Sequence, residues 1–342
     1  MFSPNSVEIT AVGLGSAGTK IVSHLSKESL LVDRFVYVSC DSADLANIDN
    51  GEKILIESPV ERLLTPAIVR GLALESHSRI RAALSGSRVV FVVAGLGRAT
   101  GSGLAPFVSM ISNECGATTV GVAVMPFDFE KKMMFNAGVT LRRLRAVAKG
   151  VIVVDNDTLM KSFPGDSTLV GLYEAANREA VKAFGALLSK PSGISVPLGL
   201  NKLLGIIIQD GYALLGMSSS DSSDKTEEAL AGAVVSIGKL AEMGEASKAV
   251  VVLRGDKSLS ASEVGVAVKR LGSMLNSKDV DVDYSVSYSG TRQLQVSLLA
   301  SGFKSTKYDD YDPLEKILRG KVIDSDPDCV VTAGLEILPS CE

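Results

Sequence analysis

Two glycine-rich segments carry the residue types that bind phosphate through the protein backbone. The first reads GLGSAGTK from Gly13 to Lys20, and the second reads GLGRATGSG from Gly95 to Gly103. Small residues let backbone N–H groups approach an anion closely, and the N–H groups at the start of a helix bind phosphate without requiring a lysine. Each segment therefore predicts a phosphate-binding loop, and two such loops would hold one polyphosphate from two sides.

The first segment taken alone also fits a dinucleotide-binding fingerprint. Its G-x-G-x-x-G spacing ends at Gly18, and Asp41 follows 23 residues later, where an acid can bind a ribose. A glycine turn that only packs a helix on a strand would give the same pattern. A second glycine loop has no role in that fingerprint, and the Walker pattern GxxxxGK[ST] does not occur in the chain. A dinucleotide site and a Walker-type phosphate loop are therefore both disfavoured. An NAD-type enzyme acting on a small molecule stays open as the alternative.

Few side chains are candidates for the acid, base or nucleophile of such an enzyme. His24 and His77 lie in segments with helical patterning, and Asp155 and Asp157 follow a strand-like run as the nearest acids. The sequence contains no recognisable catalytic triad. The four cysteines lie far apart without a CxxC pair, so neither a zinc site nor a disulfide framework is predicted. They are Cys40, Cys115, Cys329 and Cys341.

Alternating strand-like and helix-like segments must position these loops. Between residues 7 and 159, short β-branched runs alternate with longer helix-like stretches. The runs are VEITAVG, FVYVSCD, SRVVFVVAGLG, TTVGVAVMPF and GVIVVDND. The alternation predicts an α/β fold with a doubly wound parallel sheet, whose ligands bind at loops leaving the carboxyl ends of strands. Both glycine segments follow such a strand.

The rest of the chain predicts a central helix and a second, smaller α/β domain. Residues 167–190 repeat apolar side chains at three- and four-residue spacing without an internal proline, which indicates one long helix. SSSDSSD at 218–224 predicts a loop before another helix at 225–240. We expect a nucleotide-binding domain at 1–166, the central helix at 167–190, a C-terminal α/β domain at 191–303 and a flexible acidic tail at 304–342.

The composition favours a globular, cytoplasmic protein. Of the 342 residues, 46% are hydrophobic and 22% are charged, and the formal net charge is −4. With 5% aromatic residues and no run of like charge, the chain lacks the signature of a nucleic-acid-binding protein. Its start lacks the pattern of a secretion signal, and its longest apolar runs fall short of the roughly 18 residues of a membrane span. We therefore expect no nucleic-acid partner and no direct membrane span.

Several motifs in a fixed order make the chain resemble the tubulin/FtsZ family. AGLGRATGSGLAP at 94–106 resembles the family signature loop, which reads close to AGMGGGTGTGAAP in bacterial relatives, and GLGSAGTK resembles the first phosphate loop. MPFDFE, VVDND, YEAAN and QDGYALLG follow in the order of the family. The resemblance spans residues 7–303 and suggests a divergent prokaryotic FtsZ-like protein. We expect its source to be archaeal.

The resemblance implies a GTP or GDP site and assigns its contacts residue by residue. Glu130 would hold the ribose, Tyr173 would stack on the guanine, and Asn156 and Asn177 would hydrogen-bond to the guanine from two sides. Mg²⁺ held by the phosphates is a further expectation, and no metal site made by protein side chains is expected. The residues implied to hold the phosphates are Gly15, Ser16, Ala17, Gly18, Thr19, Lys20, Ala99, Thr100 and Gly101.

Two positions in these loops depart from the family pattern and add positive charge. Lys20 stands where relatives often carry asparagine, and Arg98 with Ala99 replaces two glycines of the signature loop. Both changes would strengthen phosphate binding if the side chains face the site, whereas an Arg98 that points into solvent would not. Relatives also carry an arginine after the ribose-binding glutamate, and KKMMFNAG after Glu130 offers no obvious counterpart.

The family's catalytic acids fall in a segment that has none here. In the family, the GTP of one subunit is hydrolysed when the next subunit inserts an acidic loop that orients the attacking water. Counted back from GYALLG, the two acidic positions are Gly199 and Lys202, and residues 191–208 contain no Asp or Glu. Losing a group that positions water costs about 10² to 10⁴ in rate. We therefore expect GTP binding with weak or absent self-activated hydrolysis and no catalytic residue in this chain.

The resemblance also implies partners and a cellular role. Relatives are cytoskeletal proteins of cell division or cell shape, so this chain would assemble head to tail with itself or with another FtsZ-like protein, which would donate the missing acids. The tail holds the apolar clusters PLEKILRG and LEILP in an acidic stretch, similar in kind to the peptides by which relatives bind membrane adaptors. A membrane-adaptor protein is therefore the expected partner of residues 305–342.

Overall fold

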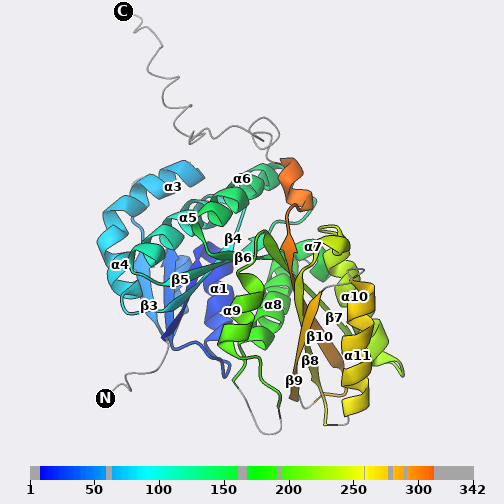
Figure 1. Cartoon of the computed structure of the whole chain (residues 1–342). Coiled ribbons are helices and arrows are strands. Elements are labelled where there is room, and N and C mark those ends of the chain that lie inside the picture. Colours follow the sequence, from blue (N-terminus) through cyan, green and yellow to red (C-terminus); the bar gives the residue numbers. More distant parts are fainter. Residues whose placement is uncertain are drawn as a thin grey trace, which may run out of the picture.

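One ten-stranded sheet runs through both halves of the protein (Figure 1). The structure, a computed structural model, describes residues 8–58, 64–160, 168–190, 195–257, 259–275, 280–288 and 291–311. The strand order is β3-β2-β1-β4-β5-β6-β7-β10-β8-β9. The strands are β1 (Ile9–Leu14), β2 (Arg34–Ser39), β3 (Glu52–Leu55), β4 (Val89–Gly95), β5 (Thr118–Met125), β6 (Gly150–Asp155), β7 (Tyr212–Ser220), β8 (Lys248–Gly255), β9 (Asp281–Tyr288) and β10 (Leu294–Phe303).

The predicted doubly wound parallel sheet is confirmed, and the second half of the chain extends it. From β3 across the sheet through β2, β1, β4, β5 and β6 to β7, each strand is parallel to its neighbours. Strand β10 runs antiparallel to β7 and β8, and β9 is parallel to β8. Strand β7 joins β6 through residues 213–215, which pair with 152–154. The smaller α/β unit is thus built on the same sheet.

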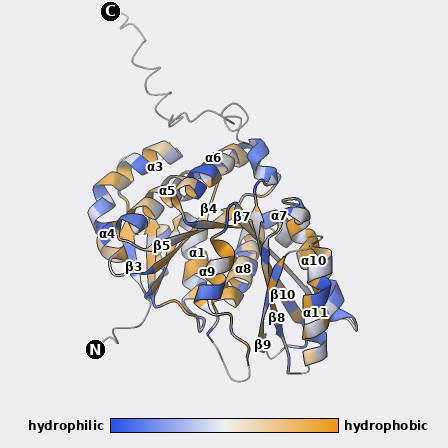
Figure 2. Ribbon diagram, viewed as in Figure 1, coloured by the Kyte–Doolittle hydropathy of each residue, from blue (hydrophilic) through white to orange (hydrophobic). Residues whose placement is uncertain are grey.

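Helices cover both faces of this sheet, because its central strands are apolar on both sides. In β4, Val90 and Val92 point to one core, while Val89, Phe91 and Val93 point to the other. The first core lies under α3 (Pro66–Ala73), α4 (His77–Leu84), α5 (Ala99–Glu114), α6 (Lys131–Val147), α10 (Lys225–Gly238) and α11 (Ala261–Met274). The second lies under α1 (Gly15–Leu25), α8 (Leu169–Leu188) and α9 (Leu200–Ile207). Figure 2 shows that most of these helices carry both hydrophilic and hydrophobic residues.

Short helices complete the described chain. They are α2 (Ala43–Ala46), α7 (Asn156–Met160) and the 3₁₀ segments η1 (Leu74–Ser76), η2 (Met243–Glu245) and η3 (Lys307–Tyr311). None of the helices in the described ranges is long and apolar enough to span a membrane.

The long helix predicted over residues 167–190 is confirmed as α8. It begins after Thr168, whose hydroxyl caps it by accepting a hydrogen bond from the Gly171 N–H at 3.1 Å. The helix predicted at 225–240 is confirmed as α10. Both predictions rest on the local apolar pattern, which tertiary packing here did not override.

The loop predicted at residues 218–224 is wrong in its first three residues. Ser218, Ser219 and Ser220 belong to β7, because β10 pairs with each of them through residues 294–296. A strand partner far away in the sequence thus overrides the loop preference of a serine run.

The packed part of the chain extends past residue 303, where the flexible tail was expected to begin. Residues 304–311 lie against the fold, and the Tyr308 side chain is completely buried. The backbone N–H of Lys307 donates to the Leu240 carbonyl at 2.8 Å. The rest of the expected tail, 312–342, with both apolar clusters of the adaptor prediction, lies outside the described residues.

Candidate functional site

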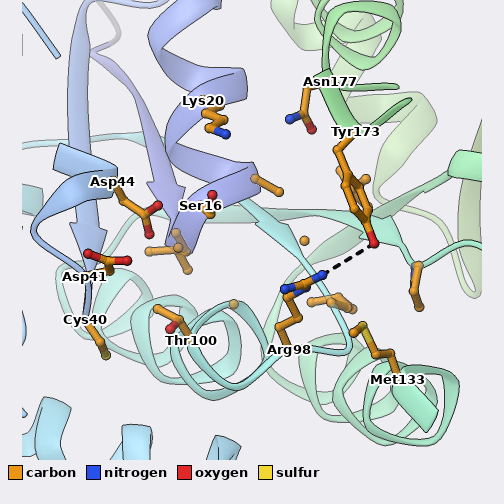
Figure 3. Close-up of a pocket in the computed structure, with 18 of the residues that line it drawn as sticks. Ser16, Lys20, Cys40, Asp41, Asp44, Arg98, Thr100, Met133, Tyr173 and Asn177 are labelled. Atoms are coloured by element: carbon orange, nitrogen blue, oxygen red, sulfur yellow. Dashed lines mark hydrogen bonds between the residues drawn. The ribbon is translucent and has the colours of Figure 1, made fainter. Parts of the chain in front are cut away.

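A cavity of about 1050 Å³ opens at the carboxyl ends of the parallel strands (Figure 3). The segments that follow β1, β2, β4, β5 and β6 line it, together with the first turns of α8. The chain winds outward from β1 to β2 and β3, and in the opposite direction from β4 to β5 and β6. The cavity thus lies at the topological switch point of the sheet and is large enough for a nucleotide.

The first glycine loop forms the start of α1 and faces the cavity. Gly15, Ser16, Ala17 and Lys20 line it. Gly15 has a φ of 63°, the left-handed region that favours glycine.

The other two residues predicted in this loop lie beneath it. A Cβ on Gly18 would come within 2.3 Å of the Val93 carbonyl oxygen, so glycine is needed for α1 to pack on β4. Thr19 is fully buried and its hydroxyl donates to the Gly15 carbonyl at 2.7 Å. Gly18 and Thr19 therefore shape the loop and do not line the cavity.

The second glycine loop forms the start of α5. Thr100 and Gly101 line the cavity, whereas Ala99 packs against the core beside it. The Ser102 hydroxyl accepts a hydrogen bond from the Gly97 N–H at 2.8 Å and closes the loop. Neither α1 nor α5 has a side-chain cap or an acidic residue in its first turn. Both helix starts therefore direct unpaired N–H groups and positive dipole ends at the cavity, as a phosphate site requires.

Three polar residues line the opposite end of the cavity. Tyr173 and Asn177, one turn apart on α8, point the same way in Figure 3, and Asn156 follows β6. Asn156 is 8% exposed, and its Oδ1 has no hydrogen-bond partner among the described residues. A buried unpaired amide oxygen costs about 1 to 3 kcal/mol, which a ligand N–H would recover. This end is therefore suited to a hydrogen-bonding base.

Arg98 reaches across the cavity to the residues predicted for the ribose and the base. Its Nη2 lies 3.4 Å from the Tyr173 hydroxyl and 3.8 Å from Glu130 Oε1, and its guanidinium carbon lies 5.6 Å from the Tyr173 ring centroid. The Tyr173 hydroxyl also donates to Glu130, which accepts a hydrogen bond from the Phe127 N–H at 3.0 Å. Burial, followed by the hydrogen bond to Glu130, raises the pKa of Tyr173. Arg98 thus connects Glu130, predicted to bind the ribose, with Tyr173, predicted to stack on the base. The sequence leaves two other places open for Arg98, at the phosphates or in solvent.

The segment after β2 contributes residues that lie outside both glycine loops. Cys40, Asp41 and Asp44 line the cavity and lie near Ser16 and Thr100 in Figure 3. The dinucleotide fingerprint assigns Asp41 to a ribose and not to phosphates. Their place directly after a parallel strand was the signal that would have identified them. Burial raises the pKa of the Cys40 thiol, so it stays protonated.

Charged groups surround the turn that carries Asn156. Asp155 and Asp157 flank this residue, Asp128 lies opposite, and Lys307 lies between Asp128 and Asp155 at 3.4 and 3.3 Å. The Asp157 Oδ2 accepts a hydrogen bond from the Asp128 N–H at 2.7 Å. Burial, and then the Asp155 carboxylate, raises the pKa of Asp157 from 3.8 to about 6. In the described ranges, no group of three acidic, histidine or cysteine side chains is arranged to hold a metal ion.

Asp157→Asn is expected to stabilise the protein at neutral pH and to have little effect in acid. Because the folded pKa lies above the unfolded one, the unfolded chain releases its proton first, and the stability of the wild type falls as pH rises from 3.8 to about 6. Thermal unfolding of both proteins between about pH 4 and about pH 7.5 would show their melting temperatures diverging. Asp221→Asn, on an exposed loop, is the control. A constant difference across this range would contradict the prediction.

Neither of the two positions expected for catalytic acids lines the cavity. Helix α8 begins at the cavity and has 20 residues, so its last turn lies about 30 Å from its first. Gly199 precedes α9, and Lys202 on its first turn places Nζ 2.6 Å from Asp283 Oδ1 of β9. This hydrogen bond raises the pKa of Lys202, which therefore stays protonated.

Comparison with known proteins agrees with this geometry. Residues 8–164 match the model of the Tubulin/FtsZ family, GTPase domain. Cell division protein FtsZ 1 of Methanocaldococcus jannaschii is 31% identical over 277 residues, covering 79% of this chain and 75% of that protein. Cell division protein FtsZ of Buchnera aphidicola subsp. Acyrthosiphon pisum is 32% identical over 241 residues, covering 67% of this chain and 62% of that protein.

Solved structures show the same fold. An empty FtsZ dimer from M. jannaschii has a TM-score of 0.75 at 26% identity, with 88% of this chain and 93% of that chain covered. A GTPγS-bound protofilament of CetZ2 from Haloferax volcanii has a TM-score of 0.70 at 21% identity, with 96% and 99% covered. From the shared fold and the similarity across three quarters of an FtsZ protein, we conclude that this chain belongs to the tubulin/FtsZ family of cytoskeletal GTPases.

Proposed function

We propose that this chain binds GTP or GDP in the cavity and acts as an FtsZ-like cytoskeletal protein of cell division or cell shape in the cytoplasm. The observation that carries the proposal is the polarity of the cavity. Asn156, whose buried Oδ1 is unpaired among the described residues, lines it together with Tyr173 and Asn177, and two uncapped helix starts border it as well. One end of the cavity needs a hydrogen-bond donor and the other attracts an anion. A nucleotide satisfies both ends at once.

The proposed contacts follow from this polarity. Glu130 binds the ribose, Tyr173 stacks on guanine, and Asn156 and Asn177 read its edge. Mg²⁺ is held by the phosphates. The phosphates are bound by the residues of the two loops that line the cavity, namely Gly15, Ser16, Ala17, Lys20, Thr100 and Gly101.

Weak hydrolysis is the second part of the proposal. A water-orienting acid is missing from the segment in which relatives carry it, and Lys202 occupies one of the two positions as a charged ion-pair partner of Asp283. Assembly is proposed head to tail, with another copy or with an FtsZ-like protein that donates acids. The structures of an FtsZ dimer and a CetZ2 protofilament support assembly of this kind. A membrane adaptor is proposed to bind within residues 305–342.

No observation favours the NAD-type alternative. The acid of that fingerprint, Asp41, accepts a hydrogen bond from the Ala43 N–H at 2.8 Å and lies near the phosphate loops rather than near Tyr173 and Asn177. Membership in the tubulin/FtsZ family removes its remaining support.

Replacing either base-reading asparagine is expected to weaken guanine binding. Asn156→Ala and Asn177→Ala should each lower GTP affinity about tenfold or more, because a lost buried hydrogen bond costs about 1 to 3 kcal/mol. Titration calorimetry with GTP and ATP measures both affinity and selectivity. Asn201→Ala, on the exposed side of α9, is the matched control. Equal affinity of the wild type for GTP and ATP, unchanged in both variants, would reject the proposed function.

A further inference from the structure

A buried carboxylate next to Asn156 takes two of its hydrogen-bond donors from η3, far along the sequence. The Asp155 side chain is 1% exposed. The Tyr308 hydroxyl donates to its Oδ1 at 2.8 Å, and the Lys307 Nζ lies 3.3 Å from its Oδ2. A buried charge is strongly destabilised unless it is paired and hydrogen-bonded, so these two residues determine where Asp155 can lie. Burial and the Asp155 carboxylate raise the pKa of Tyr308, whose hydroxyl therefore stays a donor.

The same carboxylate holds the turn that presents Asn156 to the cavity. The Asp155 Oδ1 accepts a hydrogen bond from the Asp157 N–H at 3.2 Å, and the Asp155 carbonyl accepts one from the Thr158 hydroxyl at 2.8 Å. Asn156 lies between these two bonds, with its own Oδ1 unpaired. A shift of the Asp155 side chain would therefore break its bond to the Asp157 N–H and loosen the turn that carries Asn156.

Residues 304–311, which we call the strap, are also attached to the second half of the chain. The Lys304 N–H donates to the Glu245 carboxylate at 2.9 Å, and the Lys307 N–H donates to the Leu240 carbonyl at 2.8 Å. Arg145 of α6 donates to the Lys304 carbonyl at 3.3 Å. Figure 1 shows η3 beside the end of α6. The strap thus joins the end of α10 and η2 to the base end of the cavity.

We propose that Lys307 and Tyr308 are positioning residues for nucleotide binding, which act through Asp155 to hold Asn156 in register with the base. Neither residue lines the cavity, so their effect is indirect. The inference rests on the proposed function. It predicts that changes in the strap affect recognition of the base and leave binding of the phosphates unaltered.

Tyr308→Phe and Lys307→Met are expected to lower the affinity for a fluorescent GDP analogue at least about fivefold, since each removes a hydrogen bond to a buried charge. Tripolyphosphate, used as a competitor, should bind each variant as it binds the wild type, because it occupies only the loops of α1 and α5. Lys307→Arg should restore most of the affinity, since it keeps the charge. Lys304→Met, an exposed lysine in the same strap, should behave as the wild type.

Two results would overturn this inference. Equal loss of GDP and tripolyphosphate affinity would show general loosening of the fold, and unchanged GDP affinity in both variants would show that the strap does not position the site. Asn156→Ala distinguishes failure of the strap inference from failure of the proposed function. If Asn156→Ala weakens GDP binding while Tyr308→Phe does not, the proposed function stands and the strap inference fails. A wild type that binds no GDP would reject both.

Discussion

Gly101→Ala is expected to lower nucleotide affinity at least about 100-fold, because it displaces the start of α5, which we propose binds the phosphates. A Cβ at this position would lie 2.1 Å from the Gly95 carbonyl oxygen and 3.1 Å from its carbonyl carbon. Both are backbone atoms at the end of β4, which cannot rotate away as a flexible side chain would. The first turn of α5 must therefore move, and with it the N–H groups that would bind the phosphates. Fluorescence titration with a GDP analogue measures the loss.

The control for this variant is Gly71→Ala in α3, where an added Cβ meets no atom within 4 Å. Circular dichroism and thermal unfolding establish that each variant is folded. Should Gly101→Ala fail to fold, Gly15→Ala tests the same loops more gently, because its Cβ would lie 3.3 Å from the Gly101 nitrogen and its φ of 63° is only strained for alanine. Binding of GDP at wild-type affinity by a folded Gly101→Ala protein would show that these loops do not hold the phosphates.

Acidic residues at Gly199 and Lys202, the two positions that the family resemblance assigns to catalytic acids, are expected to raise GTP turnover about 100-fold, at the lower end of the effect of a water-positioning group. The variant is Gly199→Asp combined with Lys202→Asp. It supplies carboxylates that can accept a hydrogen bond from water, which the protonated Lys202 cannot do. Phosphate release, followed over a range of protein concentrations, measures turnover and its dependence on self-association.

Lys202→Gln is the matched control for this variant. It breaks the ion pair with Asp283 without adding an acid, so it should leave turnover at the wild-type level. A wild-type protein that already turns over several GTP per minute, at a rate that rises steeply with concentration, would contradict the proposed loss of hydrolysis. Faster turnover in Lys202→Gln alone would indicate that the ion pair, and not the missing acids, limits the reaction.

The sequence by itself determined the parallel half of the sheet, the long helix α8 and both glycine loops. Strands buried on both faces must be apolar throughout, so runs such as that of β4 are visible without any structure. The loops are visible because close backbone contact excludes a side chain, as it does where Gly18 meets Val93 and where Gly101 meets Gly95. These features depend on local pattern or on the one residue type that fits.

Only the tertiary structure decided the serine end of β7, the direction of Arg98 and the place of the strap. Ser220 is a strand residue because Leu294, 74 positions later, pairs with it. Arg98 is long enough to reach phosphates, solvent or the base end, and the partly buried Glu130 and Tyr173 determine which it contacts. The segment after Phe303 is acidic and polar like a tail, yet Tyr308 is buried because Asp155 offers its hydroxyl an acceptor. In each case the residue that determines the structure is distant in the sequence, so the local sequence pattern could not predict the contact.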